Sequence, residues 1–101
     1  MSRYKVYTVE KGLVETDEYR DIYILTYHRL DGPAFIEYRE NGMIRREGYW
    51  INDMLHRLDG PAHITYNHTG NIQLIEYWIN DIKYTKDQYN KELLKLKVQS
   101  L

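Results

Sequence analysis

Hydrophobic side chains occupy every second position in two stretches of the chain, residues 34–39 and 62–67. A period of two predicts β-strands, because successive side chains of a strand point to opposite faces. We expect the positions that match between the stretches to face the interior. The differing face of the first stretch is expected to face solvent; it carries Phe35, Glu37 and Arg39. The matching positions are Ala34, Ile36 and Tyr38 in one stretch and Ala62, Ile64 and Tyr66 in the other.

The two stretches belong to a repeat of 28 residues. Residues 28–55 (the first unit) align with residues 56–83 (the second unit) without a gap, and 16 of the 28 positions are identical. Each unit begins with His-Arg-Leu-Asp-Gly-Pro-Ala and carries Tyr-Trp-Ile-Asn-Asp near its end. Asp-Gly-Pro and Asn-Asp are typical of turns, and Gly42 and Gly70 suit the left-handed position of a hairpin turn. Each unit is therefore predicted to form two antiparallel strands and two turns.

The two ends of the chain diverge from the repeat and are interpreted as caps. Residues 1–27 predict three diverged strands, at Tyr4–Val9, Leu13–Thr16 and Asp21–Tyr27. Residues 84–101 form the C-terminal cap. The whole chain is thus expected to be one domain, a mainly β, antiparallel meander with a C-terminal α-helix.

The C-terminal helix is predicted over residues 86–97. Thr85 followed by Gln88 is typical of a capping box, in which side chain and backbone of the two residues exchange hydrogen bonds. Tyr89, Leu93 and Leu96 follow at helical spacing. We expect this apolar stripe to cover the end of the sheet and protect an edge strand.

Composition narrows the classes of function. The 101 residues suffice for one domain, and 14 Lys and Arg against 15 Asp and Glu give a net charge of −1. This balance argues against a dedicated nucleic-acid binder, which normally carries a basic surface. The chain has no Cys and no apolar run of membrane-spanning length, so we expect a cytoplasmic protein without a membrane partner, in the host cytoplasm if it is of phage or viral origin.

The segment 49–62 resembles the Tyr-Trp-x-Asn-Gly-x-x-His-Arg-x-Asp-Gly-Pro-Ala motif of MORN-like repeat proteins, which occur in bacteria, phages and large DNA viruses. The likeness extends over roughly residues 22–90. It implies a meandering β-sheet and an interaction role, and some bacterial relatives of this kind resemble antitoxin or immunity components. The chain departs from the motif at Asp53 and Asp81, where the motif usually has Gly, so a simple type I′ turn is not assured at these positions.

Catalytic and metal sites find little support in the sequence. A His–Asp pair occurs identically in both units, and an active site duplicated in this way is not expected; a turn-stabilising contact to the carboxylate is the simpler interpretation. A zinc site from His56, His63 and His68 with Asp59 would require side chains from opposite strand faces and a turn to converge. We therefore expect no catalytic residue, no metal and no cofactor.

The sequence favours a small non-enzymatic protein that blocks or sequesters a protein target, of the antitoxin, immunity or phage counter-defence type. The alternative is a sponge for a nucleotide or another small molecule, and a homo-oligomer remains open. Aromatic and Arg side chains dominate protein interfaces, and successive residues of a strand face opposite ways, so either the Tyr or the Trp row must face outward. The candidate binding residues are Phe35, Arg39, Arg45, Arg46, Tyr49, Trp50, Arg57, His63, Tyr77 and Trp78.

Overall fold

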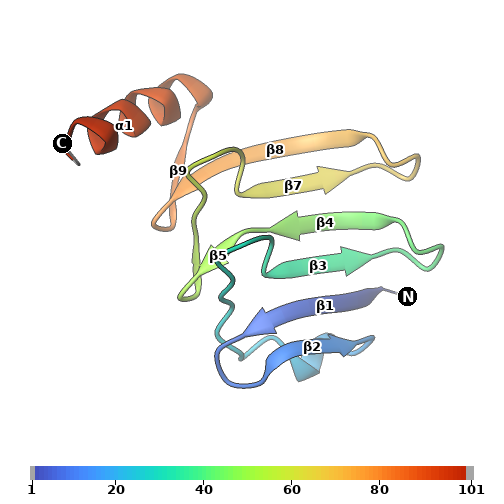
Figure 1. Cartoon of the computed structure of the whole chain (residues 1–101). Helices are drawn as coiled ribbons and strands as arrows, with labels where there is room; N and C mark the ends of the chain where they lie inside the picture. Colours follow the sequence, from blue (N-terminus) through green and yellow to red (C-terminus); the bar gives the residue numbers. More distant parts are fainter. Residues whose placement is uncertain (1, 100–101) are drawn as a thin grey trace.

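A seven-stranded antiparallel sheet forms the body of the protein (Figure 1). The computed structural model describes residues 2–99; Met1 and residues 100–101, which belong to the predicted caps, lie outside the described residues. The strand order is β2-β1-β3-β4-β7-β8-β9. The first strand, β1, lies between the edge strand β2 and β3, and from β3 onward the chain moves steadily toward the other edge. The prediction of an antiparallel meander with one C-terminal helix is confirmed.

The elements follow the repeat. β3 and β4 form the hairpin of the first unit, and β7 and β8 form the hairpin of the second, with a bulge at the same place in each. Between these hairpins the chain forms a separate two-stranded ribbon, β5 with β6. The bounds are β1 Arg3–Thr8, β2 Gly12–Thr16, η1 (a 3₁₀ turn) Tyr19–Asp21, β3 Phe35–Tyr38, β4 Ile44–Gly48, β5 Trp50–Ile51, β6 Met54–Leu55, β7 His63–Tyr66, β8 Ile72–Ile79, β9 Ile82–Tyr84 and α1 Lys86–Gln99.

The turns are built as the repeat requires. Gly42 and Gly70 have φ values of 86° and 88°, as predicted for left-handed hairpin positions. Asn52 and Asp53 both have positive φ (48° and 66°), and the pair at residues 80–81 repeats this conformation. Two consecutive left-handed residues are what a type I′ turn needs, so Asp replaces Gly here without changing the backbone.

In each of these turns the Asp carboxylate accepts a hydrogen bond, which offsets the cost of the positive φ at that residue. The backbone N–H of Tyr27 donates to Oδ1 of Asp53 at 3.1 Å, and the N–H of Leu55 donates to Oδ1 of Asp81 at 3.2 Å. The backbone N–H groups of the same two Asp residues donate to the carbonyls of Tyr27 and Leu55. A Gly at this position would relieve φ and keep the backbone N–H bond, but it would lose the second bond, which the carboxylate accepts.

The segment before the first unit is not a strand. The prediction of a strand over Asp21–Tyr27 is wrong: beyond η1 the segment turns, and it meets the sheet through a single bridge between Thr8 and Tyr27. Ile22 and Leu25 are three residues apart, which suits a turn better than the two-residue period of a strand, and their side chains pack onto the sheet. The core cluster consists of Val6, Ile22, Leu25, Tyr27, Ala34 and Phe35, with Tyr4, Tyr7, Val14 and Trp50 packed against it.

This covering segment corrects the assignment of the solvent face in the first unit. Phe35 is 7% exposed and Glu37 6% exposed, so both are buried rather than solvated as predicted. Ala34 and Ile36, on the other face of the same strand, are buried as expected. β3 is therefore covered on both faces, because the segment at residues 17–27 lies over the face that the alternation pattern left open.

The C-terminal helix begins where predicted and docks through one side chain. The capping box is present: the N–H of Gln88 donates to Oγ1 of Thr85 at 3.2 Å, and the N–H of Thr85 donates to Oε1 of Gln88 at 3.0 Å. Tyr89 is buried, whereas Leu93 and Leu96 are only half-buried. The expected apolar stripe thus covers the sheet at its first turn, and the rest of α1 projects past the sheet (Figure 1).

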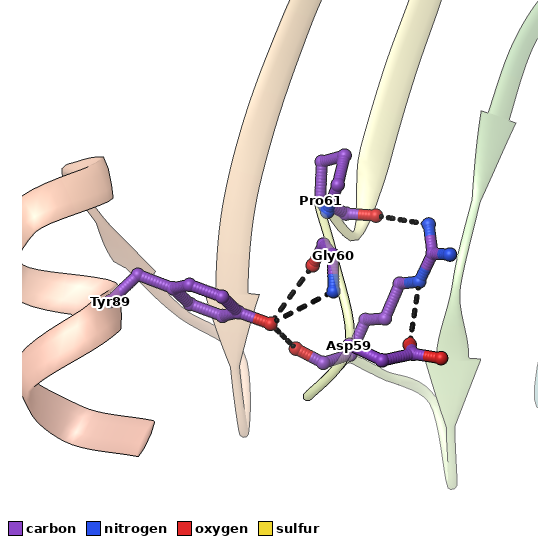
Figure 2. A network of polar contacts seen from close by, with 5 residues as sticks. Asp59, Gly60, Pro61 and Tyr89 are labelled. Carbon is purple, nitrogen blue, oxygen red and sulfur yellow. Dashed lines mark hydrogen bonds and ion pairs between the residues drawn. The ribbon is translucent and has the colours of Figure 1, made fainter. Parts of the chain in front are cut away.

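Tyr89 joins the helix to the start of the second unit (Figure 2). Its hydroxyl lies 2.7 Å from the carbonyl oxygen of Arg57, to which it donates, and accepts a hydrogen bond of 3.2 Å from the N–H of Gly60. Its ring packs on Tyr77 with 4.7 Å between the centroids. One buried hydroxyl therefore holds both the helix and the turn.

Replacing Tyr89 with Phe should lower the free energy of unfolding by about 1–2 kcal/mol, because the Gly60 N–H and the Arg57 carbonyl lose their partner while the ring contact stays. Tyr23→Phe is the control, since the Tyr23 side chain is 60% exposed. Urea unfolding followed by circular dichroism measures both. Equal stability of the two variants would show that the ring, rather than the hydroxyl, holds the helix.

Candidate protein-binding surface

The residues that are identical in the two units hold the turns together. Arg57 lies with its guanidinium 3.9 Å from the centre of the Tyr49 ring, its Nε donates to Asp59 (2.9 Å) and its Nη1 donates to the carbonyl of Pro61 (3.0 Å). We call this arrangement the arginine clamp. The first unit has the same clamp, made by Arg29, Tyr7, Asp31 and Pro33.

The clamp explains the glycine that follows Asp in each unit. A Cβ added to Gly32 would lie 2.8 Å from Cζ of Arg29, and one added to Gly60 would lie 3.1 Å from Cζ of Arg57. Only Gly60 has a φ in the region that disfavours side chains, at 154°. The glycines are thus needed mainly because the guanidinium packs against the backbone, and the turn alone does not require a positive φ at Gly32.

The repeated histidines also serve the fold. Nδ1 of His28 accepts a hydrogen bond of 2.9 Å from the N–H of Asn52, and Nδ1 of His56 accepts one of 3.0 Å from Asn80. The carboxylates that follow them bind the clamp arginines instead, and the clamp lowers the pKa of Asp31 through a hydrogen bond and charge from Arg29. The sequence pairs of His and Asp are therefore turn contacts and form no acid–base dyad.

Three of the ten candidate residues lie within these structural contacts. Arg57 and Tyr49 belong to the clamp, and Tyr77 lies under Tyr89. Each of the three is half-buried. Their exposed edges can touch a partner, but their main contacts are internal.

Four strands align a row of positions across one face of the sheet. The register pairs Phe35 with Gly48, Gly48 with His63, and His63 with Glu76, and directly opposed residues share a face. Over the first unit the row is covered: Phe35 is in the core, and the Trp50 indole lies so close to Gly48 that an added Cβ would be 2.7 Å from its Nε1.

Over the second unit the same face is polar and loses its cover. In residues 2–99 the core cluster that covers the face includes Trp50 and ends before Trp78. Trp78 instead donates from Nε1 to Oε1 of Glu76 (3.3 Å), and Lys83 Nζ lies 2.9 Å from the other oxygen of that carboxylate. A hydrogen bond from Lys83 holds the pKa of Glu76 below its ordinary value.

A second row on this face carries the arginines. Glu37 faces Arg46 across the strands, and Arg46 faces Thr65. Arg46 donates from Nε to Glu37 at 2.6 Å, and Nε of Arg45 is 3.6 Å from the other carboxylate oxygen, which Ser2 also contacts. Burial would raise the pKa of Glu37, but the hydrogen bonds from Ser2 and Arg46 outweigh it and the pKa lies below the ordinary value.

The remaining arginine candidate, Arg39, is turned toward the second unit. Its Nη2 donates to the carbonyl of Tyr66 at 2.9 Å. Arg39 thus bridges the two hairpins at the end of the sheet where their turns lie, away from the Trp row. Arg39 and Arg46 each donate a hydrogen bond within the protein, whereas the buried Nε of Arg45 lies near Glu37 without a hydrogen bond.

The surface that the sheet brings together on this face is smaller than the predicted set. We call it the open face and define it as Arg46, His63, Leu74, Glu76 and Trp78. Sequence reasoning missed Leu74 and Glu76; aligning the units would have indicated both, because they replace Arg46 and Gly48 of the first unit. Phe35 and Trp50 belong to the covered part of the face: Phe35 is buried, and the half-buried Trp50 packs against the core cluster.

His63 is the residue of the open face whose pKa is lowered by burial. Burial lowers its pKa below the ordinary value; the Glu76 carboxylate opposes this shift and the Arg46 guanidinium adds to it. Nδ1 of His63 is buried without a hydrogen bond and lies 3.4 Å from Oε1 of Glu76. The imidazole is therefore neutral near pH 7, with one buried nitrogen that forms no hydrogen bond.

Within residues 2–99, no group of three or more His, Asp or Glu side chains is placed to hold a metal ion. The same part of the chain contains no helix of the length and apolarity needed to cross a membrane. Comparison with protein-family models, with curated proteins and with solved structures gives no match. The geometry of the surface therefore has to carry the functional argument.

The lowered pKa of His63 predicts a pH-dependent stability. The unfolded imidazole takes up a proton near pH ~6.5, above the folded pKa, so protonation favours the unfolded chain and stability should fall as the pH drops below that value. His63→Phe, which restores the residue of the matching position 35, should lose less stability between about pH 7 and about pH 5.5. Urea unfolding of both proteins at each pH measures this; parallel losses would contradict the assigned environment.

Proposed function

We propose that this chain is a small non-enzymatic binding protein that sequesters a protein target through the open face of its second unit. One observation carries the proposal. Shared residues such as His56 and Arg57 are engaged in turns and clamps. The residues that replace Phe35 and Gly48 in the second unit, His63 and Glu76, instead form a half-exposed surface beside the shared Trp78, with a neutral imidazole and opposite charges.

The chemistry of the open face suits a protein partner. Trp and Arg are enriched among residues that dominate binding energy, and Trp78 and Arg46 flank the His63–Glu76 pair. An asymmetric target cannot be read by two identical units, so the differing positions are the ones able to give specificity. A sheet of this kind changes shape little on binding, so the inhibition we envisage is steric: the sheet covers the target's working surface.

The finer assignments rest on the resemblance to MORN-like repeats. We propose that the units are MORN-like, that the chain acts in the cytoplasm, and that its target is an enzyme or defence component, as for antitoxin, immunity or phage counter-defence proteins. The clamp supports the first of these, because it uses the His-Arg-x-Asp-Gly-Pro residues that the motif repeats.

A groove beside the helix supports the alternative function. It lies between Leu58 and α1, has a volume of about 720 Å³, and is lined mainly by leucines. A mostly apolar groove of that size could hold a small apolar molecule better than a nucleotide. Protein purified from its source, denatured and analysed by mass spectrometry should release such a molecule if this alternative holds.

Affinity capture followed by calorimetry tests the proposal. The tagged chain should retain a defined protein, and Trp78→Leu or His63→Ala should each weaken its binding by about 1–3 kcal/mol, since the truncated side chains lie on the open face. Leu30→Ala is the matched control, because Leu30 is 81% exposed outside that face. Variants are compared below their melting temperatures. If the Trp78 and His63 variants bound the target as tightly as the wild type and a groove variant such as Leu93→Ala did not bind it, the proposal would be overturned.

A further inference from the structure

One edge of the sheet is open over half of a strand. β8 runs over Ile72–Ile79, but β9 pairs only with its last three residues, 77–79. In the part of the chain that the structure describes, residues 72–76 therefore have a strand partner on one side only, which is β7. In the first unit, residues 46–48 of the matching stretch pair with strands on both sides, β3 and β7.

The open edge is more apolar than the paired strand it repeats. Arg45-Arg46-Glu47 of the first unit becomes Gln73-Leu74-Ile75 in the second. Ile72, Leu74 and Ile75 are 62%, 50% and 40% exposed. Soluble proteins normally protect an edge strand with charges, prolines or bulges, because an unpaired apolar edge invites another strand. Here the charged sequence lies inside the sheet and the apolar sequence lies at its edge.

The greater exposure of the second unit does not explain why its edge strand is more apolar than the matching strand of the first unit. Where the face of the second unit loses its cover, the sequence responds as expected: Phe35 is replaced by His63, and Gly48 by Glu76. At the edge, residues 73–75, the sequence changes the other way: it is more apolar than residues 45–47 of the first unit. The opposite edge of the sheet, β2, conforms to the rule, since Glu15 pairs there with Arg3 and lies next to Thr16 and Asp17.

We infer that the open edge of β8 binds the same edge of a second copy of this chain, as an antiparallel pair about a two-fold axis. The free stretch has five residues, is bounded by β9 at one end and by the hairpin turn at the other, and so matches itself when reversed. Leu74 lies at its centre and meets Leu74 of the second copy. The pair continues the sheet across the axis, as β7 continues it beyond β4 within the chain.

Charge and symmetry favour a second copy over another strand. Glu76, the only charged residue of the five, is already neutralised by Lys83, so two copies approach without like charges opposed. The whole chain carries a net charge of −1, which adds little repulsion. A two-fold pair closes after two copies, whereas pairing of β8 with the charged β2 edge would propagate as an open fibre. The inference concerns the backbone edge of β8, whereas the proposed target uses the face of the sheet; Leu74 belongs to both, and Ile75, which pairs with Ile64 on the other face, belongs to the edge alone.

Solution mass and site-specific cross-linking test the inference on the full chain. Light scattering after gel filtration should give about twice the chain mass of 12.3 kDa. The chain lacks Cys, so Leu74→Cys and Leu94→Cys each introduce a single thiol, at side chains that are 50% and 63% exposed. Mild oxidation should convert Leu74→Cys to a disulfide-linked dimer and leave Leu94→Cys, on the helix, monomeric.

Charge placed on the axis gives the complementary result. Leu74→Lys should return the mass to that of one chain, because two lysines would face each other; Ile75→Lys serves if the first variant does not fold, as judged by circular dichroism. A wild-type chain that stays monomeric into the millimolar range overturns the inference in favour of an edge left for another protein's strand. Equal cross-linking of the two Cys variants, or a dimer that survives both lysine substitutions, overturns it in favour of a contact elsewhere.

Discussion

The arginine clamp is the contact on which the rest of the structure depends. A thin sheet, 18 Å in its smallest dimension, cannot surround a large core, so each hairpin needs a tie to its neighbour. The clamp supplies it: Arg57 stacks on Tyr49 from the preceding hairpin and fixes the turn through Asp59 and the Pro61 carbonyl. Cation–π contact and charge-assisted hydrogen bonds act on one side chain, which therefore sets the distance and orientation between successive units.

The clamp also separates residues that build the fold from residues that are free to vary. Arg, Asp and Pro recur because each contributes an atom to the clamp, Gly recurs because a Cβ would meet the guanidinium, and His recurs because its Nδ1 accepts a hydrogen bond from the Asn-Asp turn. The strand positions between the turns face no such demand once the sheet is formed, and they diverge according to what lies over them. The first unit, covered by Ile22, Leu25 and Tyr27, keeps an aromatic and a glycine, and the second unit carries an imidazole and a carboxylate in their places.

The repeat made most of the fold predictable. An ungapped 28-residue period predicts the hairpin of each unit and its turns, and the Thr85–Gln88 pair locates the helix, but the separate ribbon β5–β6 in the first unit was not predicted. The failures share one cause, since each depends on a contact from outside the repeat. Phe35 is buried by a segment whose residues do not alternate, Glu37 is engaged by Ser2 at the N-terminal end and by Arg46, and the open edge of β8 arises because β9 is short. Candidate residues such as Tyr49 and Arg57 were recognised as important, but periodicity could not show that they contact each other.

Tyr89 stands where a third clamp arginine would act, since the position 28 residues after Arg57 is Thr85, the cap of the helix. Its ring takes the place of the guanidinium on Tyr77, and its hydroxyl closes the last turn. The helix therefore caps the last repeat through Tyr89, whose contacts are with residues that every unit of this kind contains. Units could be inserted between residues 55 and 56 without altering either end, and each would widen the sheet by two strands, about 10 Å. Duplication of a unit within the gene would thus widen the sheet in steps of fixed size while the N-terminal strands and the C-terminal helix stay the same.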